Sequence, residues 1–133
     1  MPIEWREKMS IGDATIDQDH HALIRLINQY EEAIAQHDAR LLRHTFEGLC
    51  DYARAHFKRE EKLMETVYFP ERNAHGEIHK EFLRRVTDFH FQLLGGEKLP
   101  IAQASQFLHD WFVDHVLNED LKLRDYILNH RRH

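Results

Sequence analysis

The chain has 133 residues, of which 42% are hydrophobic and 31% are charged, a composition typical of a soluble globular protein. Its 23 acidic residues outnumber the 18 basic ones, and the resulting net charge of −5 leaves no electrostatic footprint for nucleic acid. A lone Cys50 excludes an internal disulfide, and no apolar run approaches the roughly 18 residues of a membrane span. We therefore expect a single cytoplasmic domain over residues 1–133, with 12 histidines as its compositional outlier.

The first 16 residues, 1–16, show no sustained hydrophobic period and are predicted to form an extended arm. The arm packs on a helical bundle of about residues 17–128 through the apolar side chains Trp5, Met9, Ile11 and Ile16. The first helix of the bundle is predicted to run to about Gln36, with Asp17 or Asp19 as its cap. One histidine interrupts its apolar stripe, which reads His20, Leu23, Ile27, Tyr30 and Ile34.

A second helix is predicted to begin after Asp38, whose side chain can cap it. Its inward stripe reads Leu42, Phe46, Leu49, Ala53, His56, Glu60, Leu63 or Met64, and Val67. His56 and Glu60 are four residues apart, so they lie on the same face of the helix. Burying a carboxylate without a partner is costly, so either this helix end is exposed or a positive group neutralises Glu60.

Two further helices follow a break at Tyr68-Phe69-Pro70-Glu71. The third helix is predicted to end at Gly95-Gly96, and its stripe reads His75, His79, Phe82, Val86, Phe89 and Leu93. The fourth opens at Leu99-Pro100 and directs inward Ala104, Phe107 or Leu108, Trp111 and His115. A short final helical segment carries Leu121, Leu123, Tyr126 and Ile127. Four amphipathic helices with short connections predict an all-α, antiparallel up-down-up-down bundle.

Each inner stripe of this bundle is interrupted by residue types that bind metal ions. The interruptions fall early in the first and third helices and late in the second and fourth, which places all of them at one end of an antiparallel bundle. Five histidines and one carboxylate exceed the needs of a single zinc ion, whereas two octahedral ions sharing carboxylates would use them. Asp120 is then the expected second bridge. It follows His115 by five residues, a rotation of about 140° in a regular helix, so the turn between them must be loosened.

These segments resemble the hemerythrin family, in particular the single-domain bacteriohemerythrins. The resemblance covers most of the chain and fills all seven ligand positions of the family. The matching residues are Trp5, Ser10-Ile11-Gly12, Ile16-Asp17-Gln18-Asp19-His20-His21-Ala22-Leu23, Ile27-Asn28, His56-Phe57-Lys58-Arg59-Glu60-Glu61, Met64, His75-Gly76-Glu77-Ile78-His79, and Trp111-Phe112-Val113-Asp114-His115-Val116-Leu117-Asn118-Glu119-Asp120.

The resemblance implies a non-haem di-iron centre that binds dioxygen reversibly. One iron ion would be held by His75, His79 and His115, and the other by His20 and His56. Two carboxylates, Glu60 and Asp120, would bridge the ions together with an oxo or hydroxo group. The ion with two histidines would keep an open coordination position for dioxygen.

Two positions depart from the family pattern. Phe112 stands where a leucine usually lines the oxygen pocket beside the tryptophan, here Trp111, so the larger ring is expected to change ligand kinetics. Leu123 stands where the family often has a tyrosine, three residues after Asp120. The surroundings of that bridging carboxylate are therefore left open by the sequence.

The leading interpretation is a dioxygen-binding protein for transport, storage or delivery to an oxygen-using partner, and not an enzyme. Sensing of oxygen, nitric oxide or redox state through the same site is a second interpretation. A di-iron oxidase or iron-handling protein is a third, but ferritin-like sites use Glu-x-x-His motifs, which this sequence lacks. A bundle with zinc or no metal is the remaining alternative.

Overall fold

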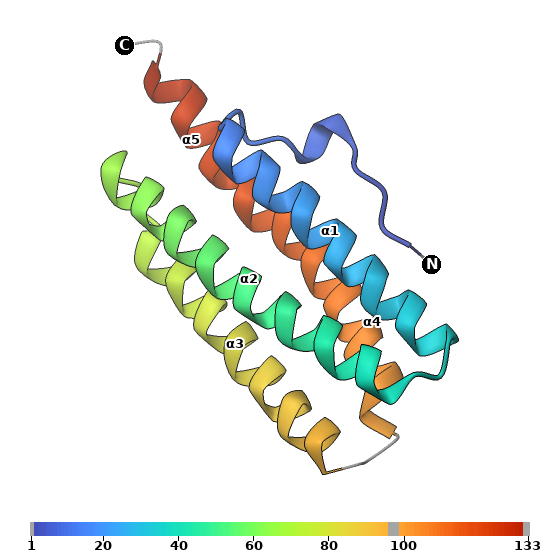
Figure 1. The fold of residues 1–133 in the computed structure, drawn as a ribbon. Helices are drawn as coiled ribbons and strands as arrows, with labels where there is room; N and C mark the ends of the chain where they lie inside the picture. The colour runs from blue at the N-terminus through green and yellow to red at the C-terminus, as the bar shows by residue number, and fades with distance from the viewer. Residues whose placement is uncertain (1, 96–98, 132–133) are drawn as a thin grey trace.

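The chain folds into four long antiparallel helices, as the sequence predicts (Figure 1). The computed structural model describes residues 2–95 and 99–131, and this part of the chain contains no strand. The helical elements in chain order are η1 (Glu7–Met9), α1 (Ala14–Ala35), α2 (Ala39–Thr66), α3 (Arg72–Leu94), α4 (Leu99–Asp114), η2 (His115–Asp120) and α5 (Leu121–Arg131). Within these residues, none of the helices combines the length and apolar character needed to cross a membrane.

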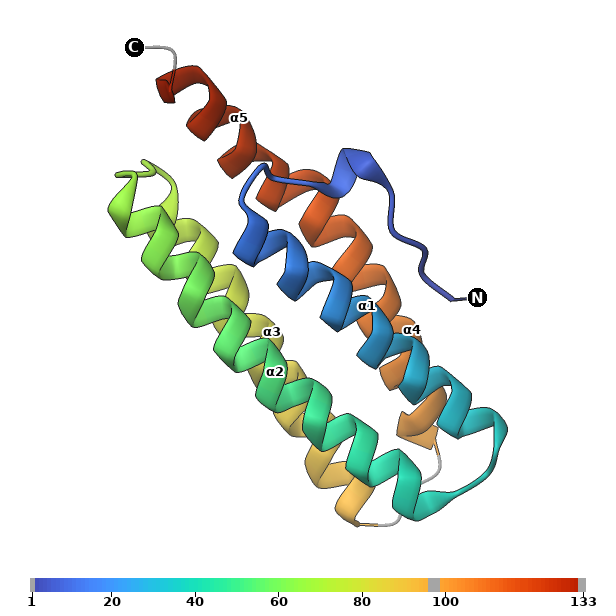
Figure 2. The ribbon, with the colours of Figure 1, turned by 45° about the horizontal axis from the view of Figure 1, so that its top comes forward.

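The N-terminal arm packs along the outside of α1 and α4, in both views of the ribbon (Figures 1 and 2). Its Met9 and Ile11 are buried, as expected, and Asn28 of α1 holds it by hydrogen bonds to the N–H and carbonyl of Ile3. The arm is shorter than predicted, because α1 begins at Ala14.

The predicted caps of α1 were wrong. Asp13 is the N-cap, and its side chain accepts a hydrogen bond from the amide of Ile16. Asp17 instead ties the arm to the helix, because it accepts from the Ser10 hydroxyl and the amide of Ile11. Periodicity marks a helix face, but it does not say which of several nearby aspartates ends the extended segment.

The remaining helix boundaries follow the sequence signals closely. Asp38 caps α2 as predicted, since its carboxylate accepts from the amides of Arg40 and Leu41. The turn between α2 and α3 passes through Tyr68 in the left-handed region, with φ of 57°, and buries the next side chain, Phe69. This turn lets α3 run back beside α2.

The apolar core has two parts. The larger part fills most of the bundle, and Leu108, rather than the half-buried Phe107, provides the fully buried contact from α4. A smaller cluster lies where α5 joins the bundle and consists of Ile11, Ile16, Met64, Phe69, Leu123 and Ile127. Met64 is one turn beyond Glu60, so this second cluster places apolar side chains next to the metal-binding residue types.

Candidate metal centre

The seven side chains expected to bind metal converge in the interior of the bundle. Each is at most 5% exposed, and together they are His20, His56, Glu60, His75, His79, His115 and Asp120. Their ligand atoms form two groups, each with all atoms within 4.8 Å of one another. One group contains three of the histidines, the other contains the remaining two, and both include Glu60 and Asp120.

The two oxygens of Glu60 face different groups of histidines. Oε1 lies 2.6 Å from Nε2 of His75 and 3.2 Å from Nε2 of His79. Oε2 lies 3.4 Å from Nε2 of His56 and 3.8 Å from Nε2 of His20. Since Glu60 follows His56 by one turn of α2, regular helical geometry is sufficient to aim both side chains inward.

Asp120 divides its oxygens between the two groups in the same way. Oδ1 lies 3.0 Å from Nε2 of His115 and 3.1 Å from Nε2 of His75, whereas Oδ2 lies 3.0 Å from Nε2 of His20. The segment from His115 to Asp120 is a π-helix. Its i→i+5 hydrogen bonding widens the turn, which brings a residue five positions on to the inner face. The loosened turn that the sequence required is therefore confirmed.

Several buried ligand atoms lack the hydrogen bonds that burial demands. Among the described residues, no hydrogen bond of acceptable geometry reaches Nε2 of His20, Oε2 of Glu60 or either carboxylate oxygen of Asp120, although other ligand atoms lie nearby. In addition, the Nε2 atoms of His79 and His115 face each other at 3.2 Å, so either a hydrogen or a cation must lie between their lone pairs. A cation between these atoms would satisfy them, and imidazole with carboxylate is a donor set that suits iron. The residues present thus fit a non-haem di-iron site.

The pKa values in this cluster show the same demand for positive charge. Burial lowers the pKa of His20, but the adjacent carboxylates of Asp120 and Glu60 outweigh it and raise the pKa to about 10. The same balance raises the pKa of His75 to about 10 and that of His115 to about 9. Burial also works against the charged form of Glu60, yet the surrounding histidines hold its pKa well below the ordinary value. Protons and metal ions therefore compete for this cluster.

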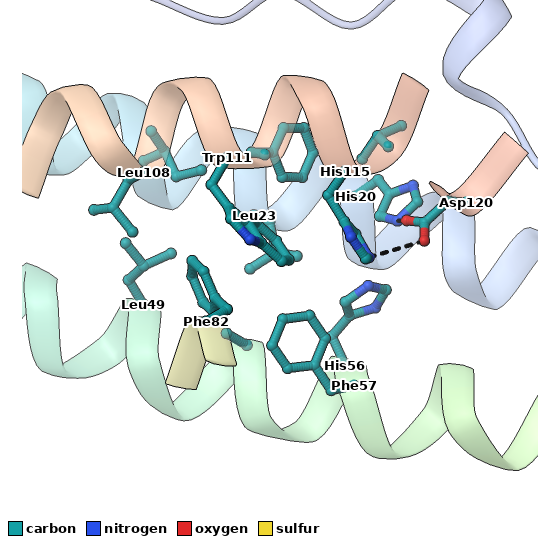
Figure 3. Close-up of a pocket in the computed structure, with 14 residues that line it drawn as sticks. His20, Leu23, Leu49, His56, Phe57, Phe82, Leu108, Trp111, His115 and Asp120 are labelled. Atoms are coloured by element: carbon teal, nitrogen blue, oxygen red, sulfur yellow. Dashed lines mark ion pairs between the residues drawn. The ribbon is translucent and has the colours of Figure 1, made fainter. Parts of the chain in front are cut away.

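A small apolar cavity of about 20 Å³ adjoins the centre (Figure 3). It has room for a water-sized molecule, which needs roughly 10–15 Å³. His20, His115 and Asp120 lie at one end of it, and Leu49 and Leu108 lie at the other (Figure 3).

Both expected pocket residues, Trp111 and Phe112, line this cavity. The Phe112 ring stands edge-on to His20, with centroids 5.8 Å apart, and the Trp111 ring stacks on His115 at 4.3 Å. Leu123 does not reach the cavity, because it is fully buried in the smaller apolar cluster.

Two polar residues at this site were missed from the sequence. Asp19, predicted as a helix cap, is buried, and its Oδ2 lies 3.0 Å from Nδ1 of His56. Burial raises the pKa of Asp19, but hydrogen bonds from His56, Arg59 and Tyr52 outweigh it and hold the pKa well below its usual range. Glu61 contacts Nδ1 of His79 at 2.9 Å. Both contacts join helices, so helical spacing alone could not reveal them.

A four-helix bundle with two histidine groups that share two carboxylates defines the class of dinuclear, non-haem metal proteins. Comparison with known families narrows this class. The Hemerythrin HHE cation binding domain matches residues 12–127, and the chain belongs to the hemerythrin family. Together with the cluster, the family supports a di-iron, oxygen-binding protein.

Curated proteins that resemble this chain agree with this assignment. The chain is 27% identical to a bacteriohemerythrin of Stenotrophomonas maltophilia, over 95% of this chain and 82% of that protein. It is 29% identical to a bacteriohemerythrin of Pseudomonas aeruginosa, over 87% and 75%. Myohemerythrin-1 of Phascolopsis gouldii is 27% identical, over 92% of both chains. The crystal structure of wild-type hemerythrin superposes with a TM-score of 0.85 at 21% identity, over 91% and 94%, which supports the fold.

Proposed function

We propose that this protein binds dioxygen reversibly at a di-iron centre, for transport, storage or delivery, and that it is not an enzyme. His75, His79 and His115 would hold one iron ion, and His20 and His56 the other. Glu60 and Asp120 would bridge them, together with an oxo or hydroxo group. When bound, the irons would supply the reducing electrons and the open coordination position that dioxygen needs.

The observation that carries this proposal is the position of the apolar cavity. It touches both histidines of the two-histidine group, His20 and His56, whereas only His115 of the three-histidine group lines it. Dioxygen entering the cavity would therefore meet the half of the centre that has fewer protein ligands.

The side chains around the cavity favour binding over turnover. Apart from the ligand residues, the described residues that line it are aliphatic or aromatic, and Trp111 has the one polar hydrogen among them. In the part of the chain that the structure describes, no additional carboxylate, histidine or lysine lines this space to deliver protons to a bound molecule. The apolar walls also exclude water, which slows the loss of charged, reduced oxygen species.

Iron content and the optical spectrum test this proposal together. Purified, reduced protein is expected to hold about two irons per chain and to gain a visible absorption band in air. The band should disappear under argon and return in air, because binding is reversible. Immediate, irreversible oxidation would contradict the carrier role and favour sensing or oxidase chemistry, and zinc without iron would contradict the di-iron centre itself.

A further inference from the structure

Asp19 is a buried carboxylate that does not belong to the seven ligand-type residues. It projects from α1 toward α2 and is 4% exposed. Four hydrogen bonds reach its two oxygens, all from side chains of α2. Oδ1 accepts from the Tyr52 hydroxyl at 2.8 Å and from Nη2 of Arg59 at 2.7 Å. Oδ2 accepts from Nε of Arg59 at 2.8 Å and contacts Nδ1 of His56 at 3.0 Å.

The three partners of Asp19 occupy one face of α2. Tyr52, His56 and Arg59 are spaced by four and three residues, which stacks them along the side of the helix that faces α1. Arg59 donates two parallel hydrogen bonds to the carboxylate, the geometry that best fits guanidinium to carboxylate. Each oxygen of Asp19 thus has two neighbours, and the side chain is fixed.

This arrangement determines which nitrogen of His56 carries hydrogen. Arg59 and Tyr52 donate to the carboxylate, and a carboxylate beside a guanidinium can only accept. The hydrogen between Oδ2 of Asp19 and the ring of His56 therefore sits on Nδ1. Nε2 is then left with its lone pair, and it points at the centre, 3.4 Å from Oε2 of Glu60. A metal ion requires this form of the ring.

In the three-histidine half, the contact that corresponds to the one between Asp19 and His56 is weaker. Nδ1 of His79 contacts Glu61, but the side chain of Glu61 is 43% exposed, so water screens its charge. Within the two-histidine half, Nδ1 of His20 is buried without a hydrogen-bond partner among the described residues. His56 is therefore the histidine of that half whose outer nitrogen, Nδ1, is held by a charged neighbour.

We propose that Asp19, held by Arg59 and Tyr52, is the positioning residue that fixes His56 for metal binding and sets the iron affinity of the two-histidine half. This inference rests on the proposed di-iron function. Partners of this kind change metal affinity by about 10–100-fold when they are removed. If Asp19 only joined α1 to α2, its removal would instead lower the stability of the fold and would affect the binding of both irons equally.

Titration of metal-free protein with Fe²⁺ under argon tests the inference. The wild type is expected to bind two Fe²⁺ tightly. Asp19→Asn keeps the size of the side chain but removes its charge, so one Fe²⁺ should bind normally and the second about 10–100-fold more weakly. Glu61→Gln is the matched control on the other half, and its effect should be smaller. Two Fe²⁺ bound by Asp19→Asn with wild-type affinity, or both weakened equally, would overturn the proposal.

A second measurement separates positioning from a merely structural role. In zinc-loaded protein, which is diamagnetic, long-range proton–nitrogen spectra report the hydrogen on Nδ1 of His56. This signal should shift or vanish in Asp19→Asn and persist in Glu61→Gln. An unchanged signal would contradict the positioning role even if urea unfolding showed a loss of stability.

Arg59→Gln provides the test if Asp19→Asn fails to fold. The Arg59 side chain is 40% exposed, so its replacement leaves no buried void. Selective weakening of one Fe²⁺ supports the proposal, and unchanged binding of both overturns it. Wild-type protein that binds fewer than two Fe²⁺ would contradict the di-iron function itself, whatever the variants do.

Discussion

The two halves of the candidate centre share both carboxylates but differ in almost everything else. The half with His75, His79 and His115 has three histidines, two of which stack on the aromatic rings of Phe57 and Trp111. The half with His20 and His56 has two histidines, and both border the apolar cavity. One half is thus crowded by protein, and the other leaves space for a small molecule.

This difference shows how one cluster can hold two metal ions in different surroundings. Shared carboxylates couple the halves electrostatically, because each oxygen pair of Glu60 and Asp120 spans both. The cavity then touches both histidines of one half but a single histidine of the other, and the outer contact to Asp19 belongs to the two-histidine half alone. Variants that remove a shared carboxylate should affect both halves equally, and variants beside His20 or at Asp19 should affect mainly the two-histidine half.

The largest effect is expected from Glu60→Ala, which removes a group common to both halves. The Glu60 carboxylate lies within 4.0 Å of a ring nitrogen of each of the five histidines in the candidate centre. Its loss should reduce iron from two per chain to at most one. It should also destabilise the metal-free protein by about 3–5 kcal/mol, because buried histidines lose their counter-charge. Iron analysis and urea unfolding measure both effects.

Glu65→Ala is the matched control for this variant, because Glu65 is an exposed carboxylate on the same helix. It should keep full iron content and near wild-type stability. Complete two-iron loading of Glu60→Ala would show that the halves do not depend on this carboxylate.

A second effect concerns the protons that the halves hold when metal is removed by a chelator. The pKa of His20 and that of His75 are raised from 6.5 to about 10 in the fold. Their contribution to stability is therefore complete below about pH 6.5 and is lost as pH rises through about 10. The urea concentration at the unfolding midpoint of metal-free protein should decrease as the pH is raised from 6.5 to 10. In His20→Gln this decrease should be smaller.

Iron-loaded protein is the control for the pH series. Its metal ions replace the protons, so its stability should vary less over the same range. A metal-free protein that grows more stable toward pH 10 would contradict the assigned pKa shifts.

A smaller effect, confined to one half, is expected from Phe112→Leu. Phe112 lines the cavity edge-on to His20, so a smaller side chain enlarges the space beside the two-histidine half. Dioxygen should dissociate several-fold faster, with iron content unchanged. Stopped-flow release of dioxygen measures the rate, and Phe107→Leu, outside the cavity, is the control. Identical dissociation rates in Phe112→Leu and wild type would show that the Phe112 side chain does not control the release of dioxygen.

The smallest effect is expected at Cys50, which lies outside both halves. Its thiol is buried, and burial raises its pKa to about 11. A thiol reagent at pH 8 should therefore modify the folded protein slowly and the urea-unfolded protein quickly. Cys50→Ala should keep iron content and dioxygen release unchanged. Rapid modification of the folded protein would show that the apolar core around Cys50 opens in the native state.

The sequence predicts the regular parts of the site and misses the parts that depend on packing. His56 with Glu60, and His75 with His79, are one turn apart, so helical periodicity alone places each pair on an inner face. Asp120 required a widened turn whose existence could be inferred but whose π-helical form has no simple sequence pattern.

Asp19 could not be understood from spacing. Its partners Tyr52 and Arg59 are 33 and 40 residues away, and only the packing of α1 on α2 brings them together. As one of several polar residues near a helix start, it had the properties of a cap. The actual cap, Asp13, was three residues from the end of the predicted arm and lacked any distinguishing signal.

An X-ray structure of the iron-loaded protein, with anomalous scattering measured at the iron edge, tests the two-half centre most directly. Two anomalous peaks are predicted inside the bundle, one beside His20 and His56 and one among the three remaining histidines. Glu60 and Asp120 should each contact both peaks. A single peak, or an Asp120 that contacts neither iron, would contradict a centre built from two unequal halves.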